Sequence, residues 1–386
     1  MNQDKYVFSQ LTDFLDRNRF NYIVRKHGSD KGTRSLSCWQ QMLYMLFGQL
    51  SGRDSIRDLI AVLQAHKNKL HHLGMGSNIH STTLLRANMN HTYRIFEQLA
   101  MQMIDRARRA RADMIFEVET DGNVYAFDSS TISLCLSVFW WATFRKRKGA
   151  IKIHTLLDVR TQIPCFMLVT PASVNDIKAM EHIPYEENGF YIFDRGYNSF
   201  GDLYRIHCAG AFFVFRARGN LKFKRIYSRP CDRTSVRCDQ IGRFSAGKSP
   251  QLYPEKLRRI KYYDAESNRE FVFLTNNLTL TANDIALLYK NRWQIELFFK
   301  WIKQHLKIKS FWGHTENAVK IQLYCAIIAY CLVAIVAKEL KIDRPIYTIL
   351  QIIGFSLLDK TPIKQLLANT DYKIVKEPDY NLLLFN

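Results

Sequence analysis

The chain of 386 residues carries 55 Lys and Arg against 35 Asp and Glu, which gives a formal net charge of +20 and a pI of about 9.6. Its hydrophobic content of 47% excludes a mainly disordered chain and is sufficient for two or three domains with a sizeable core. The charge excess predicts a polyanionic partner, either nucleic acid or an anionic membrane surface.

The eight cysteines favour neither a zinc finger nor a disulfide framework. No two of them have CxxC spacing, and no pair of histidines completes a zinc pattern. The first ten residues, MNQDKYVFSQ, do not resemble a signal peptide. We therefore expect a reduced, cytoplasmic location.

The N-terminal part of the chain, residues 1–115, is predicted to be helical. The predicted helices are 36–50, 56–65, one that begins with Ser81 as its cap, and 92–111. The Ser81 helix offers the polar side chains of Thr82, Thr83, Arg86 and Asn90. Helix–turn–helix proteins read DNA with such side chains near the start of their recognition helix. A DNA-reading domain with Arg86 as a contact and a plain helical bundle both remain open.

From residue 123 the sequence predicts strands that alternate with helices, which is typical of an α/β core with a largely buried sheet. The predicted strands are 124–128, 150–159, 163–170, 189–194 and 211–216, with helices at 175–182 and 200–208. Two strands end on aspartate, at Asp128 and Asp194, and Asp158 lies at another strand end. In open α/β sheets, strand ends face the crevice where ligands bind.

Residues 216–278 interrupt this alternation and are predicted to form an irregular β-structure that finishes in a hairpin. Between 216 and 261 there are 14 Lys and Arg and three Asp and Glu, a net +11. The aromatic residues among them are Phe223, Tyr227, Phe244, Tyr253 and Tyr262. Cations interleaved with aromatics suit phosphate contact with base stacking better than they suit a membrane surface. The candidate DNA contacts in this stretch are Lys222, Lys224 and Arg225.

The segment 281–310 contains no Gly or Pro and is predicted to be one long helix with a Thr281–Asp284 capping box. At 100° per residue, one narrow stripe holds Glu296 among a tyrosine and several cations. Its other members are Tyr289, Arg292, Lys300, Lys303 and Lys307. The alternative is a surface helix with ordinary i,i+4 ion pairs. Together with Asp128 and Asp194, however, Glu296 would complete a set of three hard carboxylates suited to Mg²⁺ or Mn²⁺.

The uncharged segment 321–337 lies at the lower length limit for a membrane span, and we predict that it is a buried core helix. A further apolar helix is predicted at 346–358, in the C-terminal tail.

These residues resemble the motifs of bacterial insertion-sequence DDE transposases, in the family called insertion sequence four. Tyr289-x2-Arg292-x3-Glu296-x6-Lys303 is similar to the family's Tyr-Arg-Glu-Lys signature. The contexts AFDSSTISL around Asp128 and FDRGY around Asp194 are similar to its first and second acidic motifs. The similarity covers residues 120–340, and the N-terminal third resembles a helical domain often fused ahead of the catalytic one.

The resemblance implies an α/β protein with a ribonuclease H-like catalytic core at 116–215 and 279–340, interrupted by a basic β-rich insertion at 216–278. An all-α domain at 1–115 would recognise DNA ends, and the tail at 341–386 would be a helical segment suited to dimerisation. The implied location is the bacterial cytoplasm, at the nucleoid.

The resemblance also implies a chemistry. Asp128, Asp194 and Glu296 would bind two Mg²⁺ (or Mn²⁺) ions, and Tyr289, Arg292 and Lys303 would contact phosphates of the element end. The implied reaction is nicking, hairpin formation by the freed 3′-hydroxyl, hairpin opening and strand transfer, performed by a homodimer on the terminal inverted repeats and on target DNA. A flipped base is usual in the hairpin step, and Trp293, Trp301 and Trp312 are candidates to stack on it, although core positions are the alternative for each.

Three other functions remain as alternatives. A metal-dependent nuclease of the same fold would cut without joining. A DNA-binding regulator would have no use for the three carboxylates. The interpretation as a membrane protein would depend on residues 321–337 alone.

Overall fold

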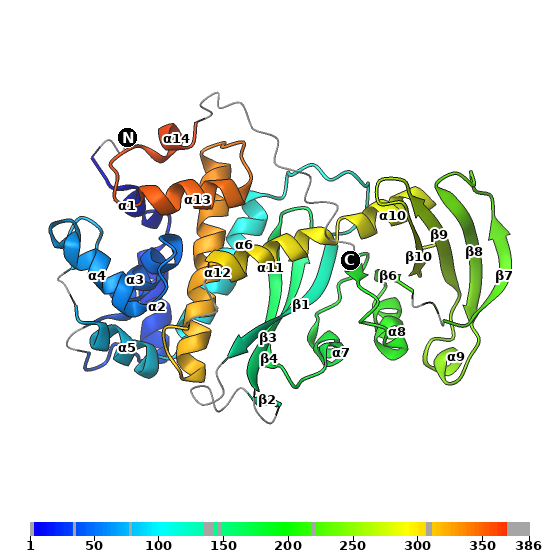
Figure 1. The fold of residues 1–386 in the computed structure, drawn as a ribbon, viewed down its shortest axis with the longest axis horizontal. Helices are drawn as coiled ribbons and strands as arrows, with labels where there is room; N and C mark the ends of the chain where they lie inside the picture. Colours follow the sequence, from blue (N-terminus) through cyan, green and yellow to red (C-terminus); the bar gives the residue numbers. More distant parts are fainter. Residues whose placement is uncertain are drawn as a thin grey trace. The chain divides into compact units, whose positions relative to one another are not determined.

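The computed structural model describes residues 4–33, 36–76, 79–134, 143–145, 148–217, 219, 221–305 and 311–368 (Figure 1). The chain divides into two compact units. The first is built from Met1–Asp113, Ile132–Ile151 and Phe298–Thr370, and the second from Met114–Thr131 and Lys152–Leu297. The second unit contains all three carboxylates of the predicted metal site.

One mixed sheet of ten strands has the order β2-β3-β1-β5-β6-β10-β9-β8-β7, with β4 paired to β3. The first six strands in the sequence are β1 (Val124–Leu134), β2 (Thr143–Arg145), β3 (Lys148–Asp158), β4 (Ile163–Pro171), β5 (Phe190–Phe193) and β6 (Phe212–Arg216). β5 is parallel to both β1 and β6, and its four residues are all buried. Short, continuous apolar runs such as this one are what a sheet covered on both faces requires.

The helices that accompany these strands in the second unit are α7 (Asp176–Ala179), η2 (Met180–His182) and α8 (Phe200–Cys208). α8 has the predicted bounds and joins the parallel strands β5 and β6, a connection that needs a crossover segment of this kind. Its first turn is capped by the Ser199 side chain, which accepts from the Asp202 N–H.

The basic insertion continues the sheet of the core. Its strands β7 (Phe223–Arg229), β8 (Val236–Phe244), β9 (Leu257–Asp264) and β10 (Arg269–Thr275) pair antiparallel in succession, and α9 (Ser249–Leu252) precedes β9. β10 also pairs antiparallel with β6. The final hairpin is present as predicted, and Asn268 in its turn has a φ of 52°, a conformation that asparagine tolerates. The stretch is therefore more regular than its sequence suggests.

The described residues before Val124 form helices and turns. The helices are α1 (Val7–Thr12), α2 (Arg17–His27), α3 (Cys38–Leu50), α4 (Ile56–Ala65), η1 (Lys67–Lys69), α5 (Ser81–Asn90) and α6 (Tyr93–Ala110). α4 has the predicted bounds, and a capping box of Ser37 and Gln40 starts α3. The expectation that Ser81 caps α5 is wrong, because the helix already includes Ser81 and its N-cap is His80, which makes no side-chain capping bond.

The apolar helix predicted at 321–337 lies within α12 (Glu316–Glu339), which packs beside α6 and α3 in the first unit (Figure 1). Among the described helices, α12 is the one long and apolar enough to cross a membrane, and 94% of its most apolar window is buried inside this fold. A helix that is apolar on all sides is expected in a protein core as well as in a membrane. Burial in the core accounts for its composition.

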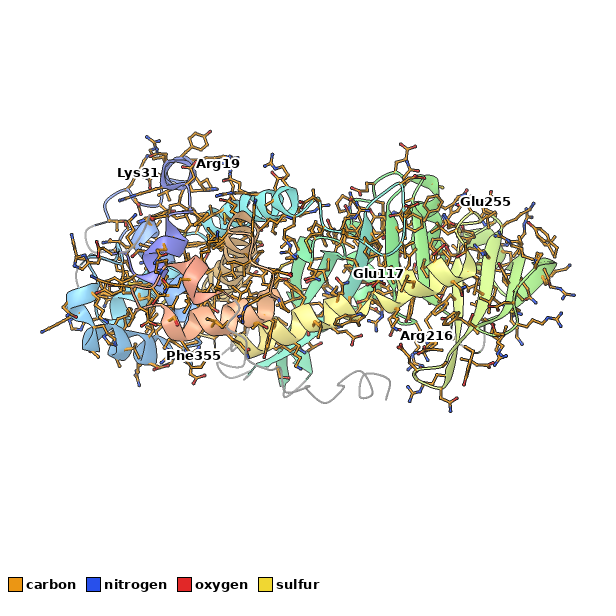
Figure 2. The ribbon with its side chains drawn as sticks, turned by 90° about the horizontal axis from the view of Figure 1, so that it is seen from above. Arg19, Lys31, Glu117, Arg216, Glu255 and Phe355 are labelled. Carbon is orange, nitrogen blue, oxygen red and sulfur yellow. The ribbon has the colours of Figure 1, made fainter. Side chains whose placement is uncertain are left out.

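The tail helix is α13 (Ile346–Ser356), and α14 (Ile363–Leu366) follows it. α13 buries Ile346, Ile349 and Ile353, and Gln10 of α1 bonds the backbone of Thr361 and Ile363. The apolar face of α13 is therefore used within the first unit. Phe355, labelled in Figure 2, remains 94% exposed.

The prediction of a single helix at 281–310 is wrong, because the structure divides this segment into α10 (Ala282–Lys290) and α11 (Trp293–His305). The Asn291 side chain donates to the Leu287 carbonyl and accepts from Gln294. The backbone bonds around it reach three residues back, from Arg292 to Tyr289 and from Ile295 to Arg292. Asparagine side chains compete with the helix in this way, and the tighter turn re-aims the chain between Tyr289 and Glu296.

Candidate active site

The register of two parallel strands brings Asp128 and Asp194 together. Phe127 of β1 lies opposite Phe193 of β5, and each aspartate is the next residue. Neighbouring strands in a sheet are about 4.8 Å apart, so the two aspartates lie side by side at the same level of the sheet. Asp194 follows the end of β5 as predicted, but Asp128 lies inside β1, because that strand continues to Leu134.

The rival aspartate, Asp158, lies at the end of β3 and beside the start of β1, away from Asp128. The Val159 N–H donates to the Val124 carbonyl, which places the end of β3 beside the start of β1. Asp158 is 2% exposed, and its carboxylate accepts from the Thr161 N–H at 3.1 Å, in the turn between β3 and β4. This environment is that of a carboxylate that closes a hairpin turn.

Tyr289 and Arg292 connect the two aspartates to Glu296. The Tyr289 hydroxyl donates to Asp194 Oδ1 at 3.1 Å, and Arg292 Nη1 lies 3.4 Å from Asp128 Oδ2. Arg292 Nη2 donates to the carboxylate of Glu296, one turn further along α11. The structure thus brings together the three predicted carboxylates and two of the residues predicted to contact phosphate.

Burial and like charge both act on Asp128. Burial raises the pKa of Asp128 to about 6, Arg292 and the Ser129 N–H oppose this rise, and the nearby Glu296 and Asp194 add to it. For Arg292, burial would lower the guanidinium pKa, but the surrounding Tyr289, Glu296 and Asp128 raise it overall. Burial also raises the pKa of Tyr289, so its hydroxyl stays protonated and donates. The site is therefore a cluster of carboxylates in a low-dielectric environment, and the Arg292 guanidinium offsets part of their negative charge.

The three carboxylates suit a divalent cation, but the Arg292 side chain lies between two of them. Three carboxylates are hard oxygen ligands of the kind that Mg²⁺ and Mn²⁺ prefer. Among the described residues, three Asp, Glu, His or Cys ligand atoms lie within 4.8 Å of one another in a group elsewhere in the chain, but not here. Arg292 lies between Asp128 and Glu296 and supplies the positive charge. A metal ion between those two carboxylates would require the guanidinium to move.

A second group of polar residues supports Asp128 from the other side and was missed by the sequence interpretation. Ser129 donates from its hydroxyl to Asp176 Oδ1 at 2.8 Å, and Lys152 Nζ lies 3.0 Å from the same oxygen. The Tyr197 hydroxyl donates to Asp128 Oδ1 at 3.3 Å. These residues come from four separate segments, and no local pattern in the sequence connects them.

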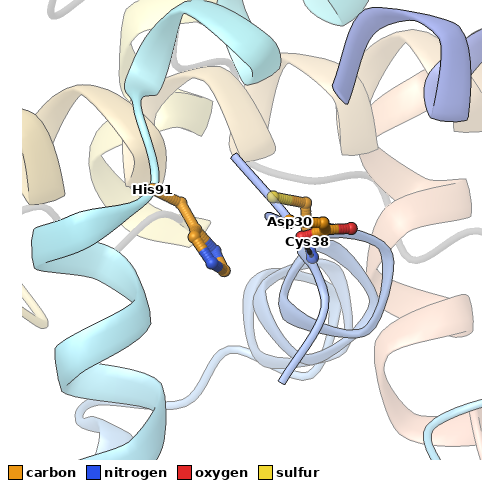
Figure 3. A group of neighbouring side chains, drawn as sticks. All are labelled: Asp30, Cys38 and His91. Carbon is orange, nitrogen blue, oxygen red and sulfur yellow. Dashed lines mark hydrogen bonds between the residues drawn. The ribbon is translucent and has the colours of Figure 1, made fainter. Parts of the chain in front are cut away.

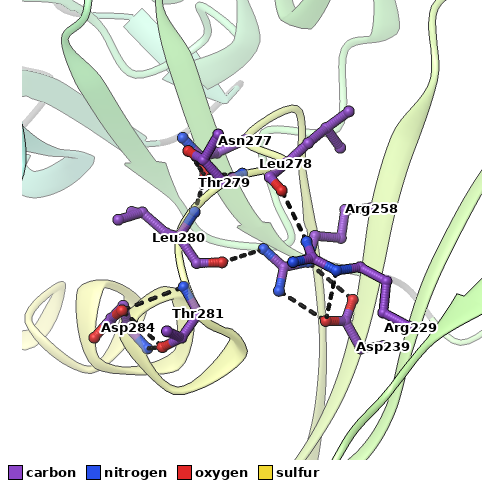
Figure 4. Close-up of polar contacts among 9 residues, drawn as sticks. All are labelled: Arg229, Asp239, Arg258, Asn277, Leu278, Thr279, Leu280, Thr281 and Asp284. Atoms are coloured by element: carbon purple, nitrogen blue, oxygen red, sulfur yellow. Dashed lines mark hydrogen bonds and ion pairs between the residues drawn. The ribbon is translucent and has the colours of Figure 1, made fainter.

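The position of α10, which carries Tyr289, is fixed by a polar network from the insertion, with the Arg258–Asp239 pair buried at its centre (Figure 4). Arg258 of β9 donates to both carboxylate oxygens of Asp239 in β8, at 2.9 and 2.7 Å, and to the Leu280 carbonyl at 2.5 Å. Arg229 of β7 donates to the Leu278 carbonyl at 2.8 Å. The predicted capping box follows directly, with the Thr281 side chain accepting from the Asp284 N–H. The basic insertion therefore holds the start of the helix that reaches the carboxylates.

The candidate DNA contacts outside this cluster are exposed. Lys222 precedes β7, the last strand of the sheet, and Lys224 and Arg225 lie on it; all three are exposed. Lys300 and Lys303 are exposed on α11 and Arg86 on α5, whereas Lys307 falls outside the described residues.

The aromatic residues of the insertion differ in exposure, and Phe223 and Tyr262 are half-buried. Phe244 and Tyr253 are buried in the core of the second unit, so base stacking by these two is wrong. Tyr227 is 50% exposed and remains a candidate.

The three tryptophans divide in the same way. Trp301 and Trp312 are both 5% exposed, and a Cβ added at Gly48 would lie 2.3 Å from the Trp312 ring. These two are core residues. Trp293, at the start of α11 and 39% exposed, is the candidate that could stack on a base.

Comparison with known proteins adds two family matches. Residues 119–332 match the model described as a transposase DDE domain, and residues 3–76 match a domain of unknown function. The first match covers more than half of the chain and includes Asp128, Asp194 and Glu296.

Relatives in three organisms are named as transposases. The y4zB protein of Sinorhizobium fredii is 38% identical over 228 residues, which are 58% of this chain and 64% of that protein. The chain thus matches slightly less than two thirds of this relative's length. A protein named for insertion sequence element IS5377 of Geobacillus stearothermophilus is 25% identical over 71% of this chain and 73% of its own length. One named for IS4SA of Synechocystis is 26% identical over 68% of this chain and 74% of its own length.

A solved piggyBac transposase synaptic complex with hairpin DNA is similar to this chain with a TM-score of 0.45 and 12% identity, over 94% of this chain and 82% of that chain.

Proposed function

Because the chain belongs to the family of transposases with a DDE domain, we propose that it moves an insertion sequence by cutting and joining DNA at the element ends. The observation that carries this proposal is the meeting of Asp128, Asp194 and Glu296 around Arg292. A mixed sheet with two of these carboxylates on adjacent parallel strands supports a ribonuclease H-like core. The insertion would then be an extension of that core's sheet.

The proposed cofactor is Mg²⁺ or Mn²⁺, as two ions held by Asp128, Asp194 and Glu296. When bound, such ions activate the attacking oxygen and stabilise the leaving oxygen of a phosphoryl displacement. In the first step water attacks phosphorus and the bond to the 3′-oxygen breaks, which leaves a 3′-hydroxyl and a 5′-phosphate. In the joining steps a 3′-hydroxyl is the attacking group. Tyr289 would orient Asp194 by its hydrogen bond, and Arg292 would be free to contact a phosphate if the bound ions took over its role of offsetting the charge of the carboxylates.

The proposed partners are double-stranded DNA, as terminal inverted repeats and target, and a second copy of the chain. Support for DNA comes from the +11 between 216 and 261, which the structure displays in part on the edge strand β7. An alternative explanation exists for these charges, because lysines on an edge strand also prevent pairing with another chain. Lys300, Lys303 and Arg86 are proposed as further DNA contacts.

The test separates metal ligands from structural carboxylates. Asp128→Ala, Asp194→Ala or Glu296→Ala should stop nicking and joining of the element ends while leaving binding of those ends nearly intact. Asp128→Cys and Asp194→Cys should be inactive in Mg²⁺ and partly recovered in Mn²⁺, because a thiolate is a poor ligand for Mg²⁺ and a better one for the softer ion. Asp158→Cys is the matched control and should show no metal-dependent recovery. Recovery at Asp158 but not at Asp128 would refute the assignment.

The same assay distinguishes the two alternative functions. Cleavage by the wild-type protein without joining to a target would favour a nuclease. Binding of DNA with neither cleavage nor joining in either metal would favour a regulator.

A further inference from the structure

Three metal-ligating side chains meet in the first unit, in a region that the proposed chemistry does not use. Asp30, Cys38 and His91 each offer a ligand atom, and these atoms all lie within 4.8 Å of one another (Figure 3). Asp30 lies in the turn after α2, Cys38 is the first residue of α3, and His91 follows the last residue of α5. Cys38 and His91 are buried, and Asp30 is exposed.

A chain of hydrogen bonds fixes which nitrogen of His91 is available. The Gln41 amide nitrogen donates to Asn88 Oδ1 at 2.7 Å, so its Oε1 is left to accept. His91 Nδ1 lies 2.6 Å from that Oε1 and must therefore be the donor. Burial lowers the pKa of His91, which favours the neutral ring. Nε2 then carries a lone pair, and a hydrogen bond that orients the other ring nitrogen is the usual arrangement for a metal-bound histidine.

A hydrogen bond also holds the Asp30 carboxylate next to Cys38. Its Oδ1 accepts from the Cys38 N–H at 2.9 Å, which fixes the carboxylate at the start of α3. Burial, followed by the hydrogen bond and charge of Asp30, raises the pKa of the Cys38 thiol. Without a cation this thiol is therefore not a nucleophile, and a neutral thiol–carboxylate contact is the alternative explanation for the cluster.

From this geometry we infer that Asp30, Cys38 and His91 form a binding site for a thiophilic divalent cation, with Zn²⁺ as the best fit. Thiolate, imidazole and carboxylate are the ligand types of zinc, whereas Mg²⁺ avoids sulfur. Binding would replace the Cys38 thiol proton with a metal–sulfur bond and release that proton to the buffer. The three ligands leave one coordination position for water or another group.

The consequence of such a site would be structural. It would tie the turn after α2 and the start of α3 to the junction between α5 and α6. α5 is the helix that carries Arg86, so its orientation would depend on the bound ion. The CxxC criterion could not find this site, because its ligands come from three distant points in the sequence.

The test uses the full-length protein loaded with Zn²⁺ and then freed of unbound metal. About one zinc per chain should remain by elemental analysis, and Asp30→Asn and Cys38→Ser should each lose it. Asp30→Asn is the sharper variant, because its side-chain oxygen can still accept from the Cys38 N–H and the residue is exposed, so folding should be preserved. Gln41→Leu removes the acceptor that orients His91, together with the bond from Gln41 to Asn88, and should weaken zinc binding by about 10–100-fold.

Two controls separate this site from others. Cys208→Ser changes an exposed cysteine and should retain the zinc. The double variant Asp128→Asn/Asp194→Asn should also retain it, so loss there would assign the metal to the carboxylate site instead. With Co²⁺ in place of zinc, a thiolate-to-metal charge-transfer band should appear in the wild-type protein and be absent from Cys38→Ser. A folded wild-type protein that holds no zinc, or an Asp30→Asn variant that holds as much as wild type, would overturn the inference.

Discussion

Replacing Asp128 by Asn should change how the stability of the second unit depends on pH. Burial raises the pKa of Asp128 from 3.8 to about 6, and its side chain is only 24% exposed. Between about pH 4 and pH 6, the folded protein therefore keeps a proton on Asp128 that the unfolded chain has already released. By linkage, the stabilising contribution is fully present below about pH 4 and is lost as pH rises through about 6.

The size of the effect follows from the shift. A rise from 3.8 to about 6 corresponds to about 3 kcal/mol of unfolding free energy. Asn has nearly the same shape and cannot ionise, so the variant avoids this loss. Between pH 4 and pH 7, without metal, the stability of Asp128→Asn relative to wild type should rise by about 2.4 kcal/mol, because part of the contribution is already lost at pH 4. Any constant cost of the substitution cancels in that comparison.

Hydrogen exchange followed by mass spectrometry is the suitable assay, because it reports each unit separately. Peptides from β5 and β6 should become more protected in the variant than in wild type as pH rises, when both proteins are compared at the same pH in EDTA. Peptides from α6 and α12, in the first unit, serve as the internal control and should not differ. A wild-type-to-variant difference that is constant between pH 4 and pH 7 would refute the raised pKa and the charge cluster on which it depends.

Three further predictions concern the insertion and the N-terminal helices. Asp239→Ala should lower the unfolding free energy of the second unit by about 3–5 kcal/mol, because it leaves the buried Arg258 unpaired, and urea denaturation would measure this. Neutralising three exposed cations should weaken DNA binding and should reduce the slope of log affinity against log salt concentration by about 0.9 per lost phosphate contact. An unchanged slope would mean that these charges protect the edge strand from pairing instead. These cations are Lys222, Lys224 and Arg225. Arg86→Ala should reduce discrimination between element-end and random DNA by about 1–3 kcal/mol if it reads a base, and equal loss on both DNAs would make it a phosphate contact.

Local sequence patterns predicted elements well where the pattern and the packing agree. The bounds of α4 and α8 follow from helical periodicity and capping, and the apolar run at β5 indicated a buried strand ending at Asp194. The break at Asn291 was missed because helical periodicity continues through it, while the side-chain bonds that interrupt the helix depend on three-dimensional geometry. The extent of β1 beyond Asp128 likewise depends on its neighbours in the sheet, which no local pattern specifies.

The meeting of the three carboxylates was predictable from the sequence, whereas their role as metal ligands stays a prediction and their surroundings could not be predicted. Two strand-end aspartates and a helical glutamate could be found from apolar runs and spacing. The residues that position them lie far apart in the sequence: Asp176 reaches Ser129, and Arg258 holds the loop before α10. Distinguishing Asp128 from Asp158 required the pairing of β3 with β1, which places Asp158 beside the start of β1 and Asp128 further along that strand.

The structure shows Arg292 between two carboxylates, and the proposed metal ions imply a second position for it, with charge deciding between the two. With the carboxylates ionised and no metal, the guanidinium lies between Asp128 and Glu296 and offsets part of their negative charge. Two divalent ions would more than neutralise the three carboxylates, so the same guanidinium would then face net positive charge and be repelled from its present position. A DNA phosphate is the anion that the proposed reaction places nearby, and Arg suits it through bidentate hydrogen bonds. We infer that metal loading and phosphate contact by Arg292 are coupled, because one cation cannot serve both partners at once.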